Sequence, residues 1–369
     1  MDDQPPPVYP APPPMAPAPS HSRRPAGRGW LILGIVTAVV LVFLLLGVVV
    51  ETGIHLLPRS LGMGPALVAL DETLIENNRS SSKIAVLEVS GLITGGYLQS
   101  DTYNSVNLLV QQLKRAAADT AVKAVILRVD SPGGEVMAAD EMYRALIEFQ
   151  NETDKPVVAS MGGLAASGGY YISAPCRWIL AHELTLTGSI GVIMHGFNYR
   201  GLLDKVGVRP EVYKSGRFKD MLSGSKREEE IAPEERAMVQ TLIDRTFDHF
   251  KQVVRDGRDP ARRRNPEEAK ALSRNWEQFA DGRILSGREA CDLGFIDELG
   301  DFKAAVQRAL KLAGIQNANL VRYDPPAPLF DIFSWLAESR HNKVKIDLGM
   351  GWPPPESGRL YFLSPALPR

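Results

Sequence analysis

The chain has 369 residues, of which 44% are hydrophobic and 23% charged, and its formal net charge at pH 7 is -1. This length and balance are typical of a globular protein with a large core. The near-neutral charge argues against a nucleic-acid-binding protein, which would carry a strong basic excess.

The first 50 residues contain no sequence that can form a globular core. Residues 1–28 hold ten of the 27 prolines, and we predict a disordered tail with local polyproline II structure. From Trp30 to Val50 the chain is apolar and free of charged residues. About 21 residues at about 1.5 Å each cross a bilayer core of roughly 30 Å, so residues 29–50 are predicted to form a transmembrane helix in contact with lipid.

The charges beside this predicted span indicate its orientation. Arg23, Arg24 and Arg28 precede the span, and no convincing small-residue cleavage site follows it. The positive-inside bias places the tail in the cytoplasm and the remainder of the chain on the extracytoplasmic side of the cell membrane. Residues 51–82 are then a linker, and the span is an uncleaved anchor.

The stretch 83–322 alternates short apolar runs with helical stripes. Strands are predicted over residues 84–89, 122–129, 156–160 and 177–181. Buried faces at a spacing of three and four residues predict two helices between them, marked by Val106, Leu109, Val110 and Leu113 and by Met142, Leu146 and Phe149. This alternation is typical of an α/β fold with a mainly parallel sheet.

A glycine-rich turn follows each of two neighbouring strands. Asp130-Ser131-Pro132-Gly133-Gly134 comes after the second strand, and a run with Ser167 between Ala166 and Gly168-Gly169 comes after the third. Sites in parallel sheets lie at the carboxyl ends of strands, where both turns fall. One turn can present a serine nucleophile and the other backbone N–H donors for an oxyanion, although two ordinary strand-ending turns are the alternative.

The general base is not settled by residue types alone. His195 and His182 have no suitable carboxylate partner nearby, and Ser167 lacks the first glycine of the Gly-x-Ser-x-Gly pattern. A lysine is the other option, but its pKa must fall from about 10.4 to roughly 7–8 by burial. By composition, Lys214 and Lys219 are equal candidates.

The sequence of the last third of the chain indicates structural elements rather than catalytic residues. After Pro233 a long helix is expected, with a buried stripe that runs from Val239 through Leu242 to Val253. The basic run from Arg255 to Arg264, which includes Arg258, is expected to be a solvated helix end and loop. The proline-rich segment 323–369 either docks on a neighbouring subunit or is loosely ordered.

Cys176 and Cys291 are the two cysteines, and neither they nor the six histidines show metal-ligand spacing. Two separately buried thiols are expected in so large a core. A disulfide between them is the alternative if the domain lies outside the membrane.

Several runs resemble the signal peptide peptidase A (SppA) family, in order and with similar spacing: residues 130–134, 165–172, 187–192, 215–220, 282–290 and 292–300. The resemblance covers roughly Lys83 to Leu312 and matches the short single-unit form. It implies a crotonase-like fold of repeated ββα units, shared with Clp protease subunits. It also implies a Ser/Lys dyad peptidase that clears signal peptides left in the membrane and needs no metal or cofactor.

The resemblance also assigns roles to residues of this chain. The nucleophile is Ser167, the base is Lys219, the hydroxyl that orients the lysine is Ser189, and the oxyanion hole uses the N–H groups of Gly133 or Gly134 with Gly168. Members of the family assemble as membrane-tethered rings or domes, in which nucleophile and base can come from adjacent subunits. The alternatives are a non-hydrolytic crotonase-like acyl-thioester enzyme and an inactive membrane scaffold.

Overall fold

A computed structural model describes residues 70–95, 104–265, 268–325 and 360–363. The predicted tail 1–28, the predicted span 29–50 and most of the predicted linker 51–82 lie outside these residues. Within the described ranges, no helix combines the length and the apolar character needed to cross a membrane.

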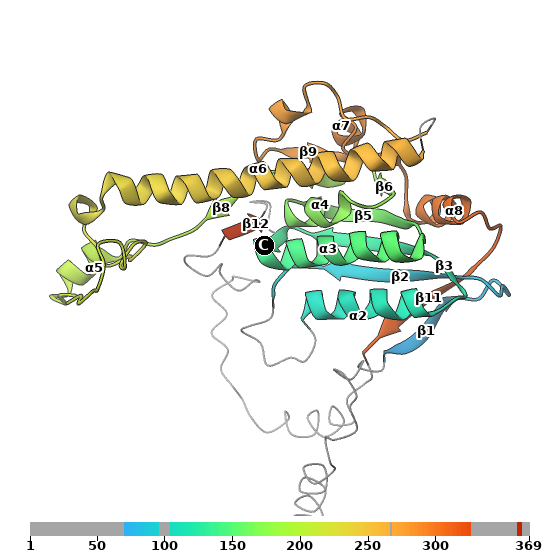
Figure 1. The fold of residues 1–369 in the computed structure, drawn as a ribbon, viewed down its shortest axis with the longest axis horizontal. Helices are drawn as coiled ribbons and strands as arrows, with labels where there is room; N and C mark the ends of the chain where they lie inside the picture. The colour runs from blue at the N-terminus through green and yellow to red at the C-terminus, as the bar shows by residue number, and fades with distance from the viewer. Residues whose placement is uncertain (1–69, 96–103, 266–267, 326–359, 364–369) are drawn as a thin grey trace, which may run out of the picture. The chain divides into compact units, whose positions relative to one another are not determined.

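A mainly parallel sheet forms the centre of the described chain (Figure 1). Its strand order is β1 (Asp71–Glu76), β11 (Asn319–Asp324), β2 (Lys83–Ser90), β3 (Val122–Ser131), β5 (Val157–Ala166), β6 (Trp178–Ala181) and β10 (Glu298–Leu299). The far end of β5 pairs instead with β7 (Leu186–Gly188), which pairs with β9 (Ile284–Ser286). Only the β1–β11 and β7–β9 pairs of this sheet are antiparallel among the described strands. The predicted α/β fold is therefore confirmed.

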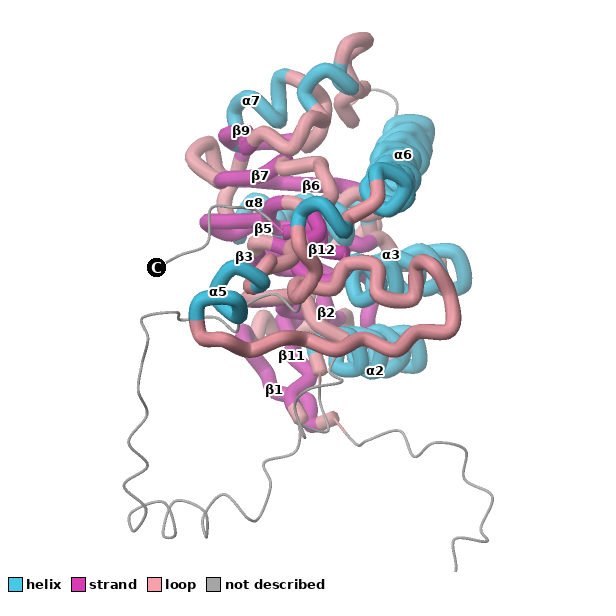
Figure 2. Tube along the Cα trace, turned by 90° about the vertical axis from the view of Figure 1, so that its left-hand side faces the viewer, coloured by secondary structure: helices cyan, strands magenta, loops and turns pink. Residues whose placement is uncertain are grey.

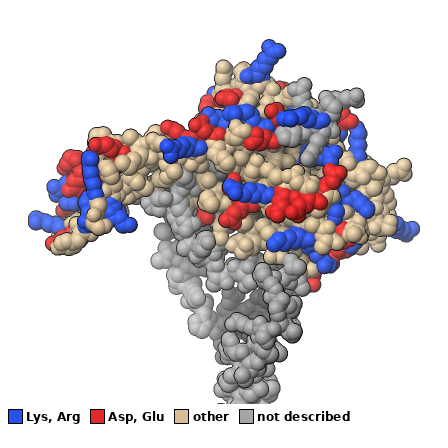
Figure 3. All heavy atoms as spheres, viewed as in Figure 1, with Lys and Arg blue, Asp and Glu red and all other residues tan. Residues whose placement is uncertain are grey.

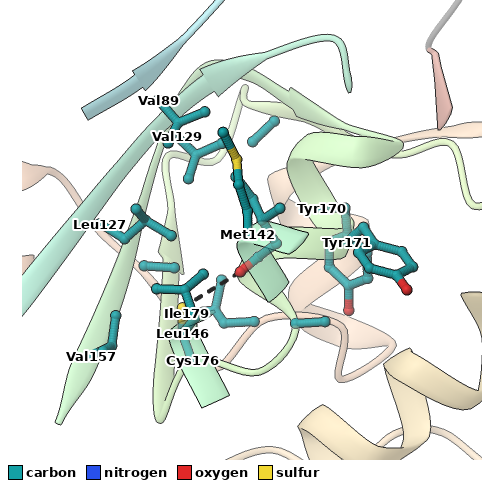
Figure 4. Packing of buried hydrophobic residues seen from close by; sticks show 14 of the residues in the cluster. Val89, Leu127, Val129, Met142, Leu146, Val157, Tyr170, Tyr171, Cys176 and Ile179 are labelled. Atoms are coloured by element: carbon teal, nitrogen blue, oxygen red, sulfur yellow. Dashed lines mark hydrogen bonds between the residues drawn. The ribbon is translucent and has the colours of Figure 1, made fainter. Parts of the chain in front are cut away.

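Helices cover both faces of this sheet. Along β2, Ala85, Leu87 and Val89 point into one apolar cluster, whereas Ile84 and Val86 point into another. The first cluster is closed by α2 (Ser105–Ala118) and α3 (Val136–Thr153), and the second by α8 (Phe302–Leu312). Strands that are buried on both faces need continuous apolar sequence, which is why these runs were recognisable. Figure 4 shows the first cluster from close by.

The predicted strands and helices of the stretch 83–322 are confirmed, and the sheet reaches beyond that stretch at both ends. The edge strand β1 lies within the range assigned to the linker, and β11 continues to Asp324. Every residue of β1 is exposed. Because it buries no face, its sequence carries no alternation of apolar and polar residues from which a strand could be predicted.

The long helix predicted after Pro233 is confirmed as α6 (Pro233–Arg264), but its stripe is buried only in part. Phe250 and Val253 are buried, whereas Leu242 is 47% exposed. The expectation that the whole stripe is core was therefore wrong for the first turns. Figure 1 shows that these turns extend past the sheet together with α5 (Arg200–Lys205).

Residues 196–240, which include α5 and the first turns of α6, are here called the arm. Its own polar contacts hold it together: Asn198 Nδ2 donates to the Lys226 carbonyl (3.0 Å), and the buried Lys226 ammonium lies 2.6 Å from the Glu235 carboxylate. Large apolar side chains are exposed along it: Phe197, Leu202, Val206, Val208, Val212, Tyr213. A surface of this kind is typical of a protein–protein contact.

The second half of α6 is anchored by a buried ion pair, so the expectation of a solvated basic run was wrong for Arg258. Its guanidinium is fully buried and pairs with Asp297. The other carboxylate oxygen of Asp297 accepts the Ile179 N–H of β6 at 2.9 Å. The partner lies 39 residues along the chain, so local charge gave no sign of the pair.

Both cysteines are buried and unpaired, as expected for separate core thiols. Burial raises the pKa of the Cys176 thiol. Cys291 lies in α7 (Gly287–Asp292), after the capping box of Ser286 and Glu289 that starts this helix.

A second, smaller sheet contains β4 (Gly133–Glu135), β12 (Leu360–Leu363) and β8 (Ile193–Met194), with β12 in the middle and antiparallel to both. Figure 2 shows β12 in front of the central strands β3 and β5 when the sheet is viewed from the left-hand side of Figure 1. The glycine turn that follows β3 thus continues directly into a strand of this smaller sheet.

Candidate active site

Ser167 occupies a sharp turn between β5 and the short helix α4 (Gly168–Ser173). Its φ is 54° and its ψ is -114°, a conformation that residues with a side chain rarely adopt. Its N–H donates to the Gly188 carbonyl at 2.8 Å. The residue is 1% exposed, and its Oγ has no hydrogen-bond partner among the described residues. Such strain at a serine that ends a strand and begins a helix is typical of a presented nucleophile.

Two buried tyrosines fix the helix that follows Ser167. Tyr170 donates its hydroxyl to the Phe295 carbonyl (2.9 Å), and Tyr171 donates its own to Asp140 Oδ1 (2.8 Å). Burial raises the pKa of both phenols, and the Asp140 carboxylate adds to the effect at Tyr171, so both remain protonated donors. Figure 4 shows the two rings beside the aliphatic side chains around Met142. The start of α4 is therefore held by groups that are themselves locked in the core.

The two glycine turns lie next to each other, because β3 and β5 are neighbours with Ser131 paired to Ala165. A Cβ on Gly169 would lie 2.7 Å from the Ser131 carbonyl oxygen, so glycine is required for this approach. The structure thus brings Ser167 and Gly168 to the turn that carries Gly133 and Gly134.

The backbone directions in β4 distinguish the two glycines of that turn. The Gly133 carbonyl accepts the Ile93 N–H (2.9 Å), and the Glu135 N–H donates to the Ile93 carbonyl (2.8 Å). Because hydrogen-bonding groups alternate along a strand, the N–H and C=O of Gly134 point away from Ile93. The Gly133 N–H donates to Ser131 Oγ at 3.1 Å. Gly134 is therefore the better oxyanion donor of the two. The N–H of Gly168 is a second donor, because the first N–H groups of a helix have no carbonyl partner within the helix.

Ser189 lies beside Ser167. The Ser167 N–H donates to the carbonyl of Gly188, which is the residue directly before Ser189. Ser189 is buried with a φ of 50°, and its N–H donates to the Arg283 carbonyl at 2.7 Å. Hydrogen bonds from the Arg283 side chain lower the pKa of Asp281 to about 2. Sequence reasoning missed Arg283, because it acts at this site through its carbonyl, a group that every residue carries.

Lys219 is not brought to Ser167 within the described chain. It lies exposed in the arm, where its N–H donates to the Gly216 carbonyl at 3.2 Å. The neighbouring Lys214 pairs with Asp220 at 2.8 Å. His195 and His182 are also exposed, and neither contacts Ser167 Oγ. The structure thus groups Ser167, Ser189 and the glycines, and leaves every candidate base outside this group.

Comparisons with known proteins match this chain to peptidases. The pattern of peptidase family S49 matches residues 149–316. A protein of Enterococcus faecium named "Putative signal peptide peptidase SppA" is 36% identical over 271 residues, 72% of this chain and 74% of that protein. "Putative protease slr0021" of Synechocystis is 38% identical over 249 residues, 67% of this chain and 81% of that protein. Protease 4 of Salmonella typhi is 36% identical over 251 residues, 68% of this chain and 38% of that protein.

The matched region contains Ser167, Ser189 and Lys219, and it begins after Gly134. The identity extends over two thirds or more of this chain for all three relatives. The chain therefore belongs to peptidase family S49 and is a serine peptidase of the SppA family.

Proposed function

We propose that this protein is a membrane-anchored endopeptidase that degrades signal peptides left in the membrane, through an acyl-enzyme formed on Ser167. The observation that carries the proposal is the strained, buried Ser167 at the start of α4, next to the outward N–H of Gly134. The substrate class is carried over from the relative named as a signal peptide peptidase. The crotonase-like arrangement of ββα units and the anchor at residues 29–50 belong to the same proposal.

In the proposed reaction, Ser167 Oγ attacks a peptide carbonyl and Lys219 accepts the hydroxyl proton. The N–H groups of Gly134 and Gly168 stabilise the oxyanion, and one such donor typically contributes about 2.7–4 kcal/mol to the transition state. Lys219 then gives the proton to the leaving amine, which frees the first product. Finally, Lys219 activates a water that hydrolyses the ester on Ser167, and Ser189 holds the amine in position.

The position of Lys219 supports a dyad completed in a homo-oligomer, a ring or a dome. A lysine is neutral at working pH only when it is removed from water, and in a single chain Lys219 is exposed. The arm around it exposes apolar side chains, among them Tyr213 at 91%. Figure 3 shows that basic and acidic side chains are also intermixed at the end of the arm around α5. Packing of the arm against a second copy would bury this surface and bring Lys219 to the partner's Ser167.

The test is cleavage of a synthetic signal peptide by the full chain in detergent. Ser167→Ala and Lys219→Ala should both abolish cleavage, whereas Lys214→Ala, a matched change at a neighbouring exposed lysine, should retain it. Turnover by Lys219→Ala at the wild-type rate would show that another group is the base. A serine-directed phosphonate should label wild type and leave Ser167→Ala unlabelled.

Mixing the two inactive variants tests the assembly. If the dyad forms between subunits, hetero-oligomers of Ser167→Ala and Lys219→Ala contain sites with one intact serine and one intact lysine. Part of the activity should then return on mixing after dissociation and reassembly. Mixtures that stay inactive, although their oligomers exchange subunits, would place both residues of each site on one chain.

A further inference from the structure

The strand that leads to the proposed nucleophile changes its neighbours just before it ends. Up to Met161, β5 pairs with β3 on one side and with β6 on the other. From Leu164 onward it pairs with β7 in place of β6. The last pair of this new register, Ala166 with Gly188, is followed by the hydrogen bond from the Ser167 N–H to the Gly188 carbonyl (2.8 Å). The place of Ser167 therefore depends on the register that begins at Leu164.

A bulge separates the two registers of β5. Val129 of β3 lies opposite Met161, and the next pair along the two strands is Ser131 with Ala165. Between these pairs β3 has one residue, Asp130, whereas β5 has three. The ladder is interrupted at such a bulge, and its extra residues have no partners on the neighbouring strand. Bulges redirect the end of a strand and are frequent next to active sites.

Two side chains hold the main chain of this bulge. The Asp130 carboxylate accepts the Leu164 N–H at 3.0 Å. From the loop between β6 and β7, the Thr185 hydroxyl donates to the Gly162 carbonyl at 2.8 Å. The same hydroxyl accepts the His182 N–H at 3.1 Å, which fixes its position. The bulge is therefore held between a carboxylate from β3 and a hydroxyl from the β6–β7 loop.

The carboxylate lies close against the bulge. A Cβ on Gly162 would lie 3.0 Å from Asp130 Cγ, whereas a Cβ on Gly163 would lie 4.0 Å from Asp130 Oδ1. The first distance is shorter than the separation of carbon atoms in good contact, and the second is an ordinary contact. The missing side chain at Gly162 thus leaves the space in which the carboxylate reaches the Leu164 N–H.

The bulge determines how far along the sheet the nucleophile turn lies. If β3 and β5 continued their pairing without the extra residues, Gly163 would lie opposite Ser131. The end of β5 would then be displaced by two residues, about 6.6 Å at 3.3 Å per residue. Ser167 would lose its alignment with Ser189 and with the Gly134 N–H. The proposed site therefore requires that the bulge be kept.

We propose that Asp130 is a positioning residue for the peptidase reaction, because its carboxylate holds the bulge of β5 and so sets the register of Ser167. This inference rests on the proposed role of Ser167. Asp130 acts through the main chain of Leu164 and not on the reacting atoms. It acts as a hydrogen-bond acceptor, so an amide oxygen at the same place can replace the carboxylate.

Kinetics of the full chain in detergent test this role. Asp130→Ala removes the acceptor, so kcat for a synthetic signal peptide should fall at least about tenfold while KM changes less than about twofold, because a small misplacement of a reacting group lowers turnover. Asp130→Asn keeps an acceptor oxygen and should retain kcat within about threefold. Gly162→Ala, which displaces the carboxylate, should resemble Asp130→Ala and replaces it as the test if that variant does not fold. Gly163→Ala is the matched control and should resemble wild type.

Hydrogen exchange followed by mass spectrometry separates this inference from the proposed chemistry, since it needs no turnover. In the Ser167→Ala chain, adding Asp130→Ala should speed amide exchange in peptides that cover residues 162–168, and adding Asp130→Asn should not. Exchange in α2 is the control for general loosening and should stay the same. If exchange depends on Asp130 in this way but wild type cleaves no signal peptide, the register inference stands and the proposed function is refuted.

Three results would overturn the inference. The first is unchanged kcat in Asp130→Ala, and the second is unchanged exchange at residues 162–168 in that variant. The third is a loss of kcat in Asp130→Asn as large as in Asp130→Ala, which would show that the charge of Asp130 matters and not its hydrogen bond to Leu164.

Discussion

The strain at Ser167 leads to a prediction in which two small substitutions reverse their usual order. At most positions glycine is less stable than alanine by about 0.5–1 kcal/mol, because glycine loses more conformational freedom on folding. At a φ of 54° and a ψ of -114° a side chain is strained, and strain of this kind costs about 1–3 kcal/mol. Ser167→Gly relieves the strain, whereas Ser167→Ala keeps it. The glycine variant should therefore be the more stable of the two, by about 1 kcal/mol net.

The pair is compared by thermal unfolding of the full chain, followed by circular dichroism. For a domain of this size, about 1 kcal/mol corresponds to roughly 2–4 °C in Tm. Both variants lack the Oγ and should be inactive, so the comparison isolates the backbone. Ser173, on the last turn of α4, provides the control, since Ser173→Ala should be more stable than Ser173→Gly. A lower Tm for Ser167→Gly than for Ser167→Ala would refute the argument from strain.

Three further predictions concern the described core and surface. Arg258→Leu leaves the buried Asp297 carboxylate without its partner and should lower the free energy of unfolding by about 3–5 kcal/mol in urea titrations, and a loss below ~1 kcal/mol would contradict this. Cys176 and Cys291 should not react with Ellman's reagent in the native protein, and two thiols should appear on denaturation. The pKa of Asp281 is lowered from 3.8 to about 2, so its ionised carboxylate stabilises the fold above pH 4, and this contribution disappears as the pH falls toward 2. Asp281→Asn should therefore lose less stability than wild type when the pH falls from 4 to 2. The difference should be under about 1 kcal/mol, because the Asp281–Arg283 pair is exposed. An equal loss in both proteins would refute the lowered pKa of Asp281.

The sequence predicted those parts of the molecule whose physical cause is local. Strands buried on both faces carry continuous apolar runs, and the turn at Ser167 needs glycine directly after it, so both were recognisable. β1 was not, because it is held mainly by backbone pairing with β11 and buries no face. Arg258 was assigned to the surface on its charge, since its partner Asp297 is remote in sequence.

The proposed catalytic residues differ in the same way. Ser167, Ser189 and Gly134 are positioned by neighbouring strands, so their proximity follows from the fold. The place of Lys219 does not, because the polar contacts described for the arm lie within the arm itself. β12 could not be predicted either, since a four-residue strand is specified by the edges that receive it rather than by its own pattern.

One half of α6 is anchored in the core and the other half projects from it, so a small tilt at the anchored half produces a larger displacement at the projecting end. From the buried Phe250 to Pro233 the helix rises about 26 Å at 1.5 Å per residue. A tilt of about 5° at the anchored end would move the far tip by roughly 2 Å, several times the tolerance of a hydrogen bond. Because the part of the arm before α6 is joined to those first turns by the ion pairs Arg217–Glu234 and Lys226–Glu235, a movement of the tip also moves the segment that contains Lys219. In the proposed dyad, core packing around Phe250 would then determine how accurately Lys219, near the other end of the helix, is placed against Ser167 of a neighbouring subunit.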